Sequence, residues 1–434
     1  MKSSVYSVLT TKVQTTFLQR LVNGFEIVKA SFLKGRNTSI KNPNKTNHPS
    51  QYPSQFVREE NTLIQTIAEA EKLVQHRDGS YFDPGKDLVD LTKNIQKLLG
   101  SRHPFLNTVS KYYFKSEGKR IRPLLVLLMS QATSIAAKQY NTSTADFYQI
   151  IDKPLTTHND ILSCNNKDTI YFPSFSSSGT IILPTQRRLA EITEMIHTAS
   201  LLHDDVIDNS QIRRNDISAN SNFGNKMAIL AGDFLLARAS IALARLRNPE
   251  VIELIATVIA NLVEGEFMQL KNGQDGTMSV FEYYMEKTYM KTASLMAKSC
   301  QAASVLGGAT LEVCDIAYAY GRNLGLAFQL IDDMLDFLTT SDELGKPIGA
   351  DLKLGLATAP VLYAWEEYPE LGPLIGRNFS QGGDVEKARQ LVYKSNGIEQ
   401  TKLLAASHCQ KAIDAITRLP KSDARNALVE LTQK

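Results

Sequence analysis

The chain has 434 residues, of which 43% are hydrophobic and 21% are charged, and its formal net charge is +3. These values are typical of a soluble globular protein with a large core, and so small a net charge does not indicate a nucleic-acid partner. The four cysteines are widely spaced, which indicates a reducing compartment and argues against a zinc site. No apolar stretch is long enough to predict a transmembrane helix.

Residues 1–58 differ in composition from the rest of the chain. They are rich in lysine and arginine, and their only acid is Glu26. Apolar residues recur at helical spacing between Val5 and Phe32, which predicts a basic amphipathic helix. Such a segment resembles a mitochondrial targeting sequence, and the alternative is a disordered or membrane-surface N-terminus.

Helical spacing of apolar residues predominates in residues 84–434, and alternating strand patterns are scarce, so we expect one large all-α domain. Pro and Gly residues separate the expected helices. The helices are expected over Leu88–Leu99, Leu124–Ala136, Lys226–Leu246, Pro249–Leu270, Val280–Leu306, Leu311–Leu338, Ala357–Tyr368 and Asp384–Ser395, with one resuming at Arg187 and a last one near Thr401–Leu419. Residues 138–184 are rich in Asn, Ser, Thr and Asp, and we expect a long mobile insertion there.

Two carboxylate clusters with the spacing D-D-x-x-D each follow an apolar helix. They are Asp204, Asp205 and Asp208, and Asp332, Asp333 and Asp336. The first and last aspartates of a cluster share one helix face, where unpaired like charges are costly. A single cluster could be a solvated helix end. Two clusters that face each other across a bundle predict Mg²⁺ ions, whose coordination a substrate phosphate would complete.

Cationic side chains accompany both clusters. Each one alone would be interpreted as a solvated surface residue, but next to two metal clusters they indicate a diphosphate site. They include Lys119, Arg122, Arg213, Arg214, Lys291, Lys346 and Lys353.

The motifs GKRIRP, IHTASLLHDDVID, AGDFLL, EGEFMQL, YMKTASL, FQLIDDMLDF and GKPIGADL occur in this order. Together they resemble the trans-isoprenyl diphosphate synthases, and among these the long-chain polyprenyl diphosphate synthases of ubiquinone biosynthesis (the hexaprenyl, solanesyl and decaprenyl types). The resemblance runs from Leu88 to the C-terminus, apart from the insertion. It implies the isoprenoid synthase fold, a helical bundle around a central cavity. One departure is Asn215, which follows two arginines where the family usually has glycine.

The resemblance also implies a reaction, which is the Mg²⁺-dependent elongation of farnesyl or geranylgeranyl diphosphate with successive isopentenyl diphosphates. The product would be an all-trans polyprenyl diphosphate of about C30–C50 for the ubiquinone side chain. We further expect a mitochondrial protein on the matrix side, in peripheral contact with the inner membrane, that forms a homodimer or a heteromer.

The resemblance assigns roles to individual residues. Catalytic roles fall to Asp204, Asp205, Asp208, Lys291, Gln329, Asp332 and Asp333, and metal binding to all six aspartates. Isopentenyl diphosphate binding falls to Lys119, Arg122, His197 and Arg214. Allylic diphosphate binding falls to Arg213, Lys291, Thr292, Gln329 and Lys346. The small side chains of Ala199 and Ser200, about one turn before Asp204, would leave room for a long product.

Three alternatives compete with an active synthase. A terpene cyclase of the same fold would carry a different second metal motif. A non-catalytic or co-catalytic subunit of a heteromeric synthase would be expected to lose aspartates if it were inactive, and this chain keeps all six. A Ca²⁺-binding structural bundle would leave the cations unexplained.

Overall fold

The computed structural model describes residues 84–114, 120–138, 182–214, 216–271, 279–338 and 349–433. All of these except Gln433 lie in one compact unit, Asn61–Thr432. The predicted targeting segment, residues 1–58, and all but the ends of the predicted insertion lie outside the described residues. The predictions about these two segments therefore stay predictions.

The described residues are almost entirely helical. Their helices are α3 (Pro84–Leu98), α4 (Pro104–Ser110), the short 3-10 helix η1 (Tyr112–Phe114), α5 (Ile121–Ser134), α7 (Pro184–Ile207), α8 (Ala219–Phe223), α9 (Asn225–Arg245), α10 (Pro249–Lys271), α11 (Val280–Thr288), the π-helical turn η3 (Tyr289–Ala293), α12 (Ser294–Leu306), α13 (Leu311–Leu338), α15 (Ala350–Lys353), α16 (Ala359–Glu367), α17 (Leu371–Gly376), α18 (Asp384–Lys394), α19 (Gly397–Ile416) and α20 (Asp423–Gln433). The strands in this part of the chain form one antiparallel hairpin, β1 (Ile212–Arg213) with β2 (Asp216–Ile217).

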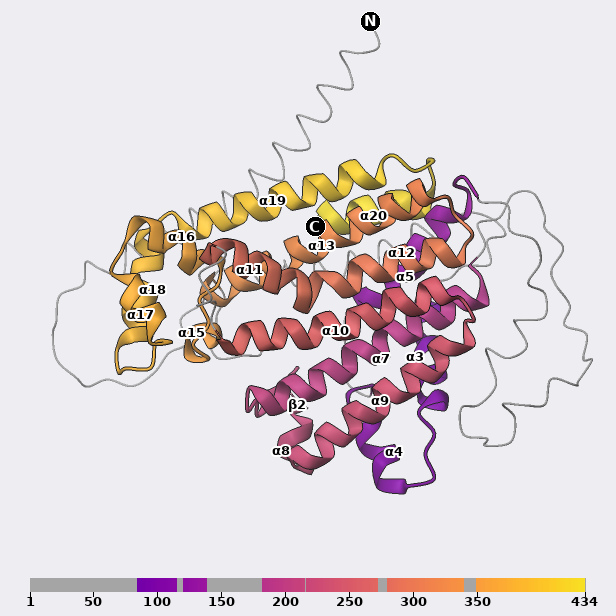
Figure 1. Ribbon diagram of the computed structural model, residues 1–434, viewed down its shortest axis with the longest axis horizontal. Helices are drawn as coiled ribbons and strands as arrows, with labels where there is room; N and C mark the ends of the chain where they lie inside the picture. The colour runs from indigo at the N-terminus through magenta and orange to yellow at the C-terminus, as the bar shows by residue number, and fades with distance from the viewer. Residues whose placement is uncertain are drawn as a thin grey trace, which may run out of the picture. The chain divides into compact units, whose positions relative to one another are not determined.

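The two helices that carry the aspartate clusters, α7 and α13, both pack against α12. α7 also contacts α5 and α9, and α13 contacts α19 along most of its length (Figure 1). The turn η3 contacts α10, α12 and α13. This packing places η3 between the elements that carry the site.

Helix boundaries follow the expected local chemistry. α10 begins at Pro249, whose missing N–H costs nothing at the first position of a helix. α11 begins with a capping box, in which Ser279 accepts from the Glu282 N–H and Glu282 accepts from the Ser279 N–H. α12 ends before Gly308, which takes φ of +67°.

The predicted helices are confirmed, and the structure adds short elements that were not predicted, among them α8, α15, α17 and the β1–β2 hairpin. The single helix expected over Val280–Leu306 is interrupted by the π-helical turn Tyr289–Ala293. The C-terminal helix α20 was not predicted, because the last expected helix ended near Leu419. α20 is held by Tyr320 of α13, whose hydroxyl donates to the Leu428 carbonyl at 2.9 Å.

Within the described ranges, α9 is the one helix long and apolar enough to cross a membrane, judged by length and a mean hydropathy of 1.7 alone. It packs against α4, α7 and α8, and its Ala228, Ala231 and Leu235 are fully buried. These contacts are those of a bundle helix.

Candidate active site

The first aspartate cluster lies at the carboxyl end of α7. Asp204 and Asp205 belong to its last turn, and Asp208 caps it by donating its backbone N–H to the Asp204 carbonyl at 2.8 Å. Burial raises the pKa of Asp204 to about 6 and also raises the pKa of Asp208, while Lys291 opposes both shifts. Lys291 is therefore close enough to act on both carboxylates.

Asp205 is fully buried and already has protein partners on both carboxylate oxygens. One oxygen accepts from the Tyr113 phenol of η1. The other accepts from Nε and Nη2 of Arg213 on β1, at 2.9 and 2.5 Å. Asp205 thus ties the end of α7 to two other elements.

The second cluster lies at the carboxyl end of α13, and its three aspartates have different surroundings. Asp332 is exposed. Asp333 is buried and accepts from the Tyr284 phenol at 2.5 Å. Asp336 is also buried and accepts from the first two backbone N–H groups of α15, at 3.0 and 3.3 Å. Asp336 therefore fixes the start of the segment that follows the cluster.

Gln329, one turn before Asp333, belongs to a continuous chain of hydrogen bonds. Its amide nitrogen donates to Asp333 at 2.8 Å, and its amide oxygen accepts from the Thr292 hydroxyl at 2.8 Å. Because a carboxylate only accepts, the amide nitrogen must face Asp333 and the amide oxygen must face Thr292. Two residues predicted to bind the allylic diphosphate therefore contact each other directly.

Lys291 lies on η3, and π-helical turns of this kind are rare and often occur at functional sites. Its ammonium pairs with Glu266 at 2.5 Å and donates to Gln269 at 3.0 Å. Both partners come from α10, in the EGEFMQL motif. Lys291 is therefore held from one side by α10 while it faces the first cluster.

The stretch from Lys287 to Thr292 joins the two clusters. Burial raises the pKa of Asp333 to about 6, and Lys287 opposes the shift. Burial lowers the pKa of Lys287, and its neighbour Lys291 lowers it further. Lys291 therefore lies toward the first cluster, and Lys287, one turn earlier in the chain, lies toward the second.

A second group of polar side chains surrounds His197 of α7. Its Nε2 lies 3.0 Å from Nη1 of Arg122. A guanidinium only donates, so this nitrogen accepts and the neutral ring carries its proton on Nδ1. Burial, followed by the charges of Arg122, Arg214 and Arg213, holds the pKa of His197 well below its usual range. Burial also lowers the pKa of Arg122 to about 10.

Glu194 supplies the opposite charge to this group. It is buried one turn before His197, and burial raises its pKa while Arg122, Arg214 and Arg120 lower it. The predicted isopentenyl diphosphate residues of the described chain therefore lie together, and the cations outnumber the carboxylate. Such an excess of buried positive charge suits an anionic ligand.

The β1–β2 hairpin presents Arg213 and Arg214. Arg213 pairs with Asp216, and Arg214, which follows Arg213, has φ of +54°. Hairpin turns favour Asn or Gly where φ is positive. Asn215, where the sequence departs from the family pattern, lies outside the described residues.

Ala199 and Ser200 lie on α7 before the first cluster. Ala199 is fully buried. Ser200 is partly buried and donates its hydroxyl to the His197 carbonyl at 2.9 Å. Both side chains are small, and their predicted effect on product length stays a prediction.

Comparison with known proteins shows the family of this chain. A sequence model described as polyprenyl synthetase matches residues 174–392. The chain is also 58% identical over 352 residues to a protein of Neurospora crassa named probable hexaprenyl pyrophosphate synthase, mitochondrial, with 79% of this chain and 78% of that protein covered. The chain belongs to the polyprenyl synthetase family.

Two further relatives support this synthase assignment. A protein of Schizosaccharomyces pombe named decaprenyl-diphosphate synthase subunit 1 is 50% identical over 353 residues, which cover 80% of this chain and 88% of that protein. A crystal structure of a polyprenyl synthase from Caulobacter crescentus, complexed with calcium and isoprenyl diphosphate, is similar at a TM-score of 0.66 and 29% identity. It covers 84% of this chain and 96% of that one.

The protein is therefore an enzyme, a trans-polyprenyl diphosphate synthase with the predicted isoprenoid synthase fold. The predicted mitochondrial location is confirmed as well, since relatives from Neurospora crassa, Yarrowia lipolytica and Saccharomyces cerevisiae are named mitochondrial.

Two of the residues assigned to the synthase site, Lys119 and Lys346, lie outside the described residues. The structure brings the others together as two aspartate clusters, the Lys291 stretch and the His197 group. It also adds residues that sequence reasoning missed, namely Tyr113, Glu194, Glu266, Gln269, Tyr284 and Lys287. Glu266 and Gln269 lie in a motif that carried the resemblance, whereas no sequence pattern links the two tyrosines to the site.

The donor set of the synthase suits Mg²⁺. Within the described ranges no three His, Cys, Asp or Glu side chains come close enough to hold an ion unaided. Mg²⁺ does not need three such groups, because it commonly takes one or two carboxylates and completes its shell with waters and substrate phosphates. Asp204, Asp208 and Asp332 fit this role, since no hydrogen-bond donor in the described part of the chain reaches their carboxylates.

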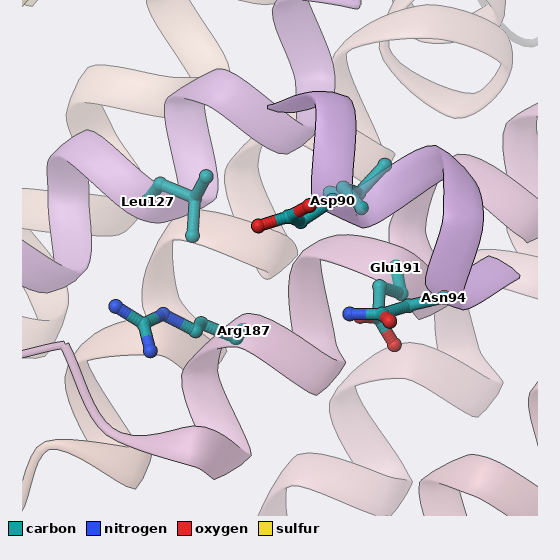
Figure 2. A pocket seen from close by; sticks show the side chains of 6 residues that line it. Asp90, Asn94, Leu127, Arg187 and Glu191 are labelled. Carbon is teal, nitrogen blue, oxygen red and sulfur yellow. The ribbon is translucent and has the colours of Figure 1, made fainter. Parts of the chain in front are cut away.

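A separate pocket of the synthase lies between α3, α5 and α7. Figure 2 shows its lining residues, Asp90, Leu91, Asn94, Leu127, Arg187 and Glu191. Along α7, Glu191 is about 20 Å from Asp204 at the rise of an α-helix. This pocket is therefore not part of the aspartate site.

Proposed function

We propose that the synthase elongates farnesyl or geranylgeranyl diphosphate with successive isopentenyl diphosphates and requires Mg²⁺. The product would be an all-trans polyprenyl diphosphate of about C30–C50, which becomes the ubiquinone side chain. The observation that carries the proposal is the stretch Lys287–Thr292, whose charges act on both aspartate clusters. This stretch supports the proposal that the two clusters act together on a single diphosphate.

The outer aspartates Asp204, Asp208 and Asp332 would hold the metal ions. Bound Mg²⁺ would neutralise the charge that develops on a departing diphosphate. No hydrogen-bond donor in the described part of the chain reaches the carboxylates of these three aspartates, so their oxygens are available to an ion. Lys291 adds a positive charge beside Asp204 and can donate to a phosphate oxygen once it leaves Glu266.

Arg122, Arg214 and His197 would bind isopentenyl diphosphate. Two guanidinium groups can each donate two parallel hydrogen bonds to phosphate oxygens. His197 is held neutral with a proton on Nδ1 and accepts from Arg122, so it orients that guanidinium. The hairpin residue Arg213 lies beside this group and faces the first cluster through Asp205. The two diphosphates would therefore meet around the end of α7.

Ionisation of the allylic C–O bond leaves a carbocation that water would quench. Buried apolar residues of α7 such as Ile196 and Ala199 keep water from the space beside the first cluster. The oxygens of Thr292 and Gln329 lie near the second cluster, where their dipoles can stabilise developing positive charge. The double bond of isopentenyl diphosphate then attacks, and a proton is lost to the released diphosphate.

A second candidate is a co-catalytic subunit of a heteromeric synthase. The name of the Schizosaccharomyces pombe relative, subunit 1, is the observation that favours it. This reading keeps the same site and predicts activity only when a partner chain is present. Both a homodimer and a heteromer are compatible with the proposal, as is peripheral contact with the mitochondrial inner membrane.

The test is incubation of the purified chain with farnesyl diphosphate, labelled isopentenyl diphosphate and Mg²⁺, followed by chromatography of the products. We expect long labelled chains from the native enzyme and none from Asp204→Ala or Asp332→Ala. Asp315→Ala, an exposed aspartate on the same helix as Asp332, is the control and should remain active. Full activity in either site variant would refute the metal assignment, and an inactive native chain would favour the heteromer.

A further inference from the structure

Lys287 is a cation beside the aspartate clusters that the motifs of the sequence did not assign. It lies in the last turn of α11, four residues before Lys291 of the π-helical turn η3. Residues at this spacing lie about one helical turn apart and share one side of a helix. The two ammonium groups are therefore neighbours, and Lys291 is among the charges that act on Lys287.

The two lysines differ in their partners. Lys291 pairs with Glu266 at 2.5 Å and donates to Gln269 at 3.0 Å. The Lys287 ammonium instead lies over the Tyr284 ring, 5.6 Å from its centroid, and within the described ranges no acceptor comes within hydrogen-bond distance of it. An aromatic ring attracts an ammonium through its quadrupole and takes up none of its three N–H donors in a conventional hydrogen bond. The donors of Lys287 are therefore available to a ligand.

The surroundings of Lys287 are anionic. The Tyr284 phenol donates to Asp333 at 2.5 Å, so the ring beneath the ammonium leads directly to the second cluster. Burial lowers the pKa of Lys287, and the charge of Asp333 is the strongest effect in the opposite direction. Asp351 of α15 and Glu266 of α10 act in the same direction as Asp333. Lys287 therefore lies among carboxylates of three helices and, in the described part of the chain, pairs with none of them.

The described residues offer the Lys287 ammonium electrostatic attraction but no acceptor. Removing a charge from water is costly unless the charge gains hydrogen bonds. A lysine that served stability alone would be expected to pair with one of the carboxylates nearby, as Lys291 does with Glu266. The unused donors instead suit a ligand that brings its own anionic oxygens. A diphosphate held between the two clusters would be such a ligand.

We propose that Lys287 is a further substrate-binding residue, whose ammonium donates to the allylic diphosphate from the side of the second cluster. Lys291 would donate to the same diphosphate from the side of the first cluster. Two point charges one turn apart would then offset the negative charge that develops on the diphosphate as the allylic C–O bond breaks. The Tyr284 ring would hold the ammonium in place and leave its donors to the substrate. The inference rests on the proposed function, because its ligand is the diphosphate between the clusters.

The first experiment measures ligand binding without turnover. The binding of inorganic pyrophosphate to the purified full chain in the presence of Mg²⁺ is measured by isothermal titration calorimetry. Lys287→Met keeps the apolar stem of the side chain but removes the charge, and we expect pyrophosphate to bind about tenfold to a hundredfold more weakly. Lys287→Arg keeps the charge and should restore most of the affinity, since a guanidinium also stacks on an aromatic ring.

Lys298→Met is the matched control for the binding experiment. Lys298 is a partly exposed lysine of α12 that has no ion pair among the described residues, and its variant should bind pyrophosphate with native affinity. Thermal unfolding checks that each variant is folded, and Lys287→Gln takes the place of Lys287→Met if the methionine variant is not. Native affinity in a folded Lys287→Met or Lys287→Gln would overturn the proposal, and so would a native chain that does not bind pyrophosphate.

The second experiment identifies which diphosphate Lys287 contacts. In steady-state elongation, Lys287→Met should raise KM for farnesyl diphosphate and leave KM for isopentenyl diphosphate unchanged. A rise confined to isopentenyl diphosphate would refute the assignment to the allylic diphosphate. A lysine with a structural role alone would change thermal stability while both KM values stay native, which would also refute it. A native chain that makes no polyprenyl product would contradict the proposed function alone, because the affinity for pyrophosphate is measured without turnover.

Discussion

Gly265 of α10 lies so close to Lys291 that a Cβ atom built on the glycine would fall 2.7 Å from Cγ of the lysine. The same Cβ would lie 3.1 Å from the Lys291 backbone nitrogen, so a flexible side chain could not relieve the clash alone. The close approach is what lets Glu266 and Gln269 reach the Lys291 ammonium. The position of the π-helical turn thus depends on the absence of a side chain on α10.

Gly265→Ala should therefore displace Lys291 and impair the reaction more than the fold. A misplacement of about 1 Å near the reacting groups can cost about a hundredfold in rate, and we expect a loss of at least tenfold in kcat. Steady-state elongation and thermal unfolding would be measured together. Gly376→Ala is the matched control, because a Cβ there meets nothing within 4 Å. Native kcat in Gly265→Ala would contradict the argument.

Asp204→Asn should stabilise the metal-free protein while it abolishes elongation. The folded pKa of about 6 exceeds the ordinary value of 3.8, so the native state favours the protonated form. The resulting destabilisation is absent at low pH, grows as the pH rises from 3.8 to about 6, and is complete above that. Asparagine does not ionise, so the free energy of unfolding of the variant should exceed that of the native protein by up to about 3 kcal/mol.

The measurement is urea unfolding of both proteins in EDTA between about pH 4 and pH 8. The difference in unfolding free energy should be near zero at the acidic end and constant above about pH 6. Asp315→Asn, at an exposed position, should stay within about 0.5 kcal/mol of the native protein. A difference that does not depend on pH would show that ionisation of Asp204 is not its cause.

Ala199→Phe should shorten the product. Ala199 is fully buried on α7, about one turn before Asp204. In the proposed function the product grows along this helix, so we expect a phenyl ring at this position to occupy space that the growing chain would use. Product length would be read by chromatography of labelled chains. Ala239→Phe places the same ring at a buried position of α9 and is expected to reduce stability without shifting the product distribution. Unchanged product length in Ala199→Phe would show that this residue does not determine the length of the product.

Tyr320→Phe should loosen the C-terminal helix. The fully buried hydroxyl of Tyr320 donates to the Leu428 carbonyl at 2.9 Å and accepts from the Thr432 hydroxyl at 3.2 Å. Loss of the phenol removes the hydrogen bond from α13 to α20 at a cost of about 0.5–1.5 kcal/mol, since the Thr432 hydroxyl still donates to the Leu428 carbonyl at 2.9 Å. Limited proteolysis should cleave α20 earlier than in the native protein, whereas Tyr363→Phe, at a partly exposed position, should not change the pattern. Equal cleavage rates would refute the anchoring role.

Most of the bundle could be predicted because its determinants are local. Apolar residues at helical spacing gave α9, α10 and α13 nearly to their observed ends, and proline or glycine marked where those helices stop. The two aspartate clusters were also visible, since each lies within one turn of one helix. The π-helical turn was not, because its extra residue leaves no mark in the spacing of an Ala-rich and Met-rich segment.

The partners of the aspartates could not be predicted from the sequence, because they come from distant parts of the chain. Tyr113 and Asp205 are 92 residues apart, and Tyr284 and Asp333 are 49 residues apart. Nothing in a D-D-x-x-D spacing shows which carboxylate is turned toward a phenol. Likewise, the sequence around Glu194 indicates only an apolar helix. The role of Glu194 depends on Arg122 and Arg214, whose proximity only the structure shows.

The contact between the Tyr113 phenol and Asp205 also bears on how such sequences can diverge. If the phenol holds the carboxylate, neither partner can be replaced alone without leaving a buried oxygen unpaired. The two positions should therefore change together across relatives of this chain, although no motif contains both. Asp204 should instead stay aspartate whatever happens at Tyr113. Asp204 and Asp205, although adjacent in one motif, would then vary independently of each other during evolution.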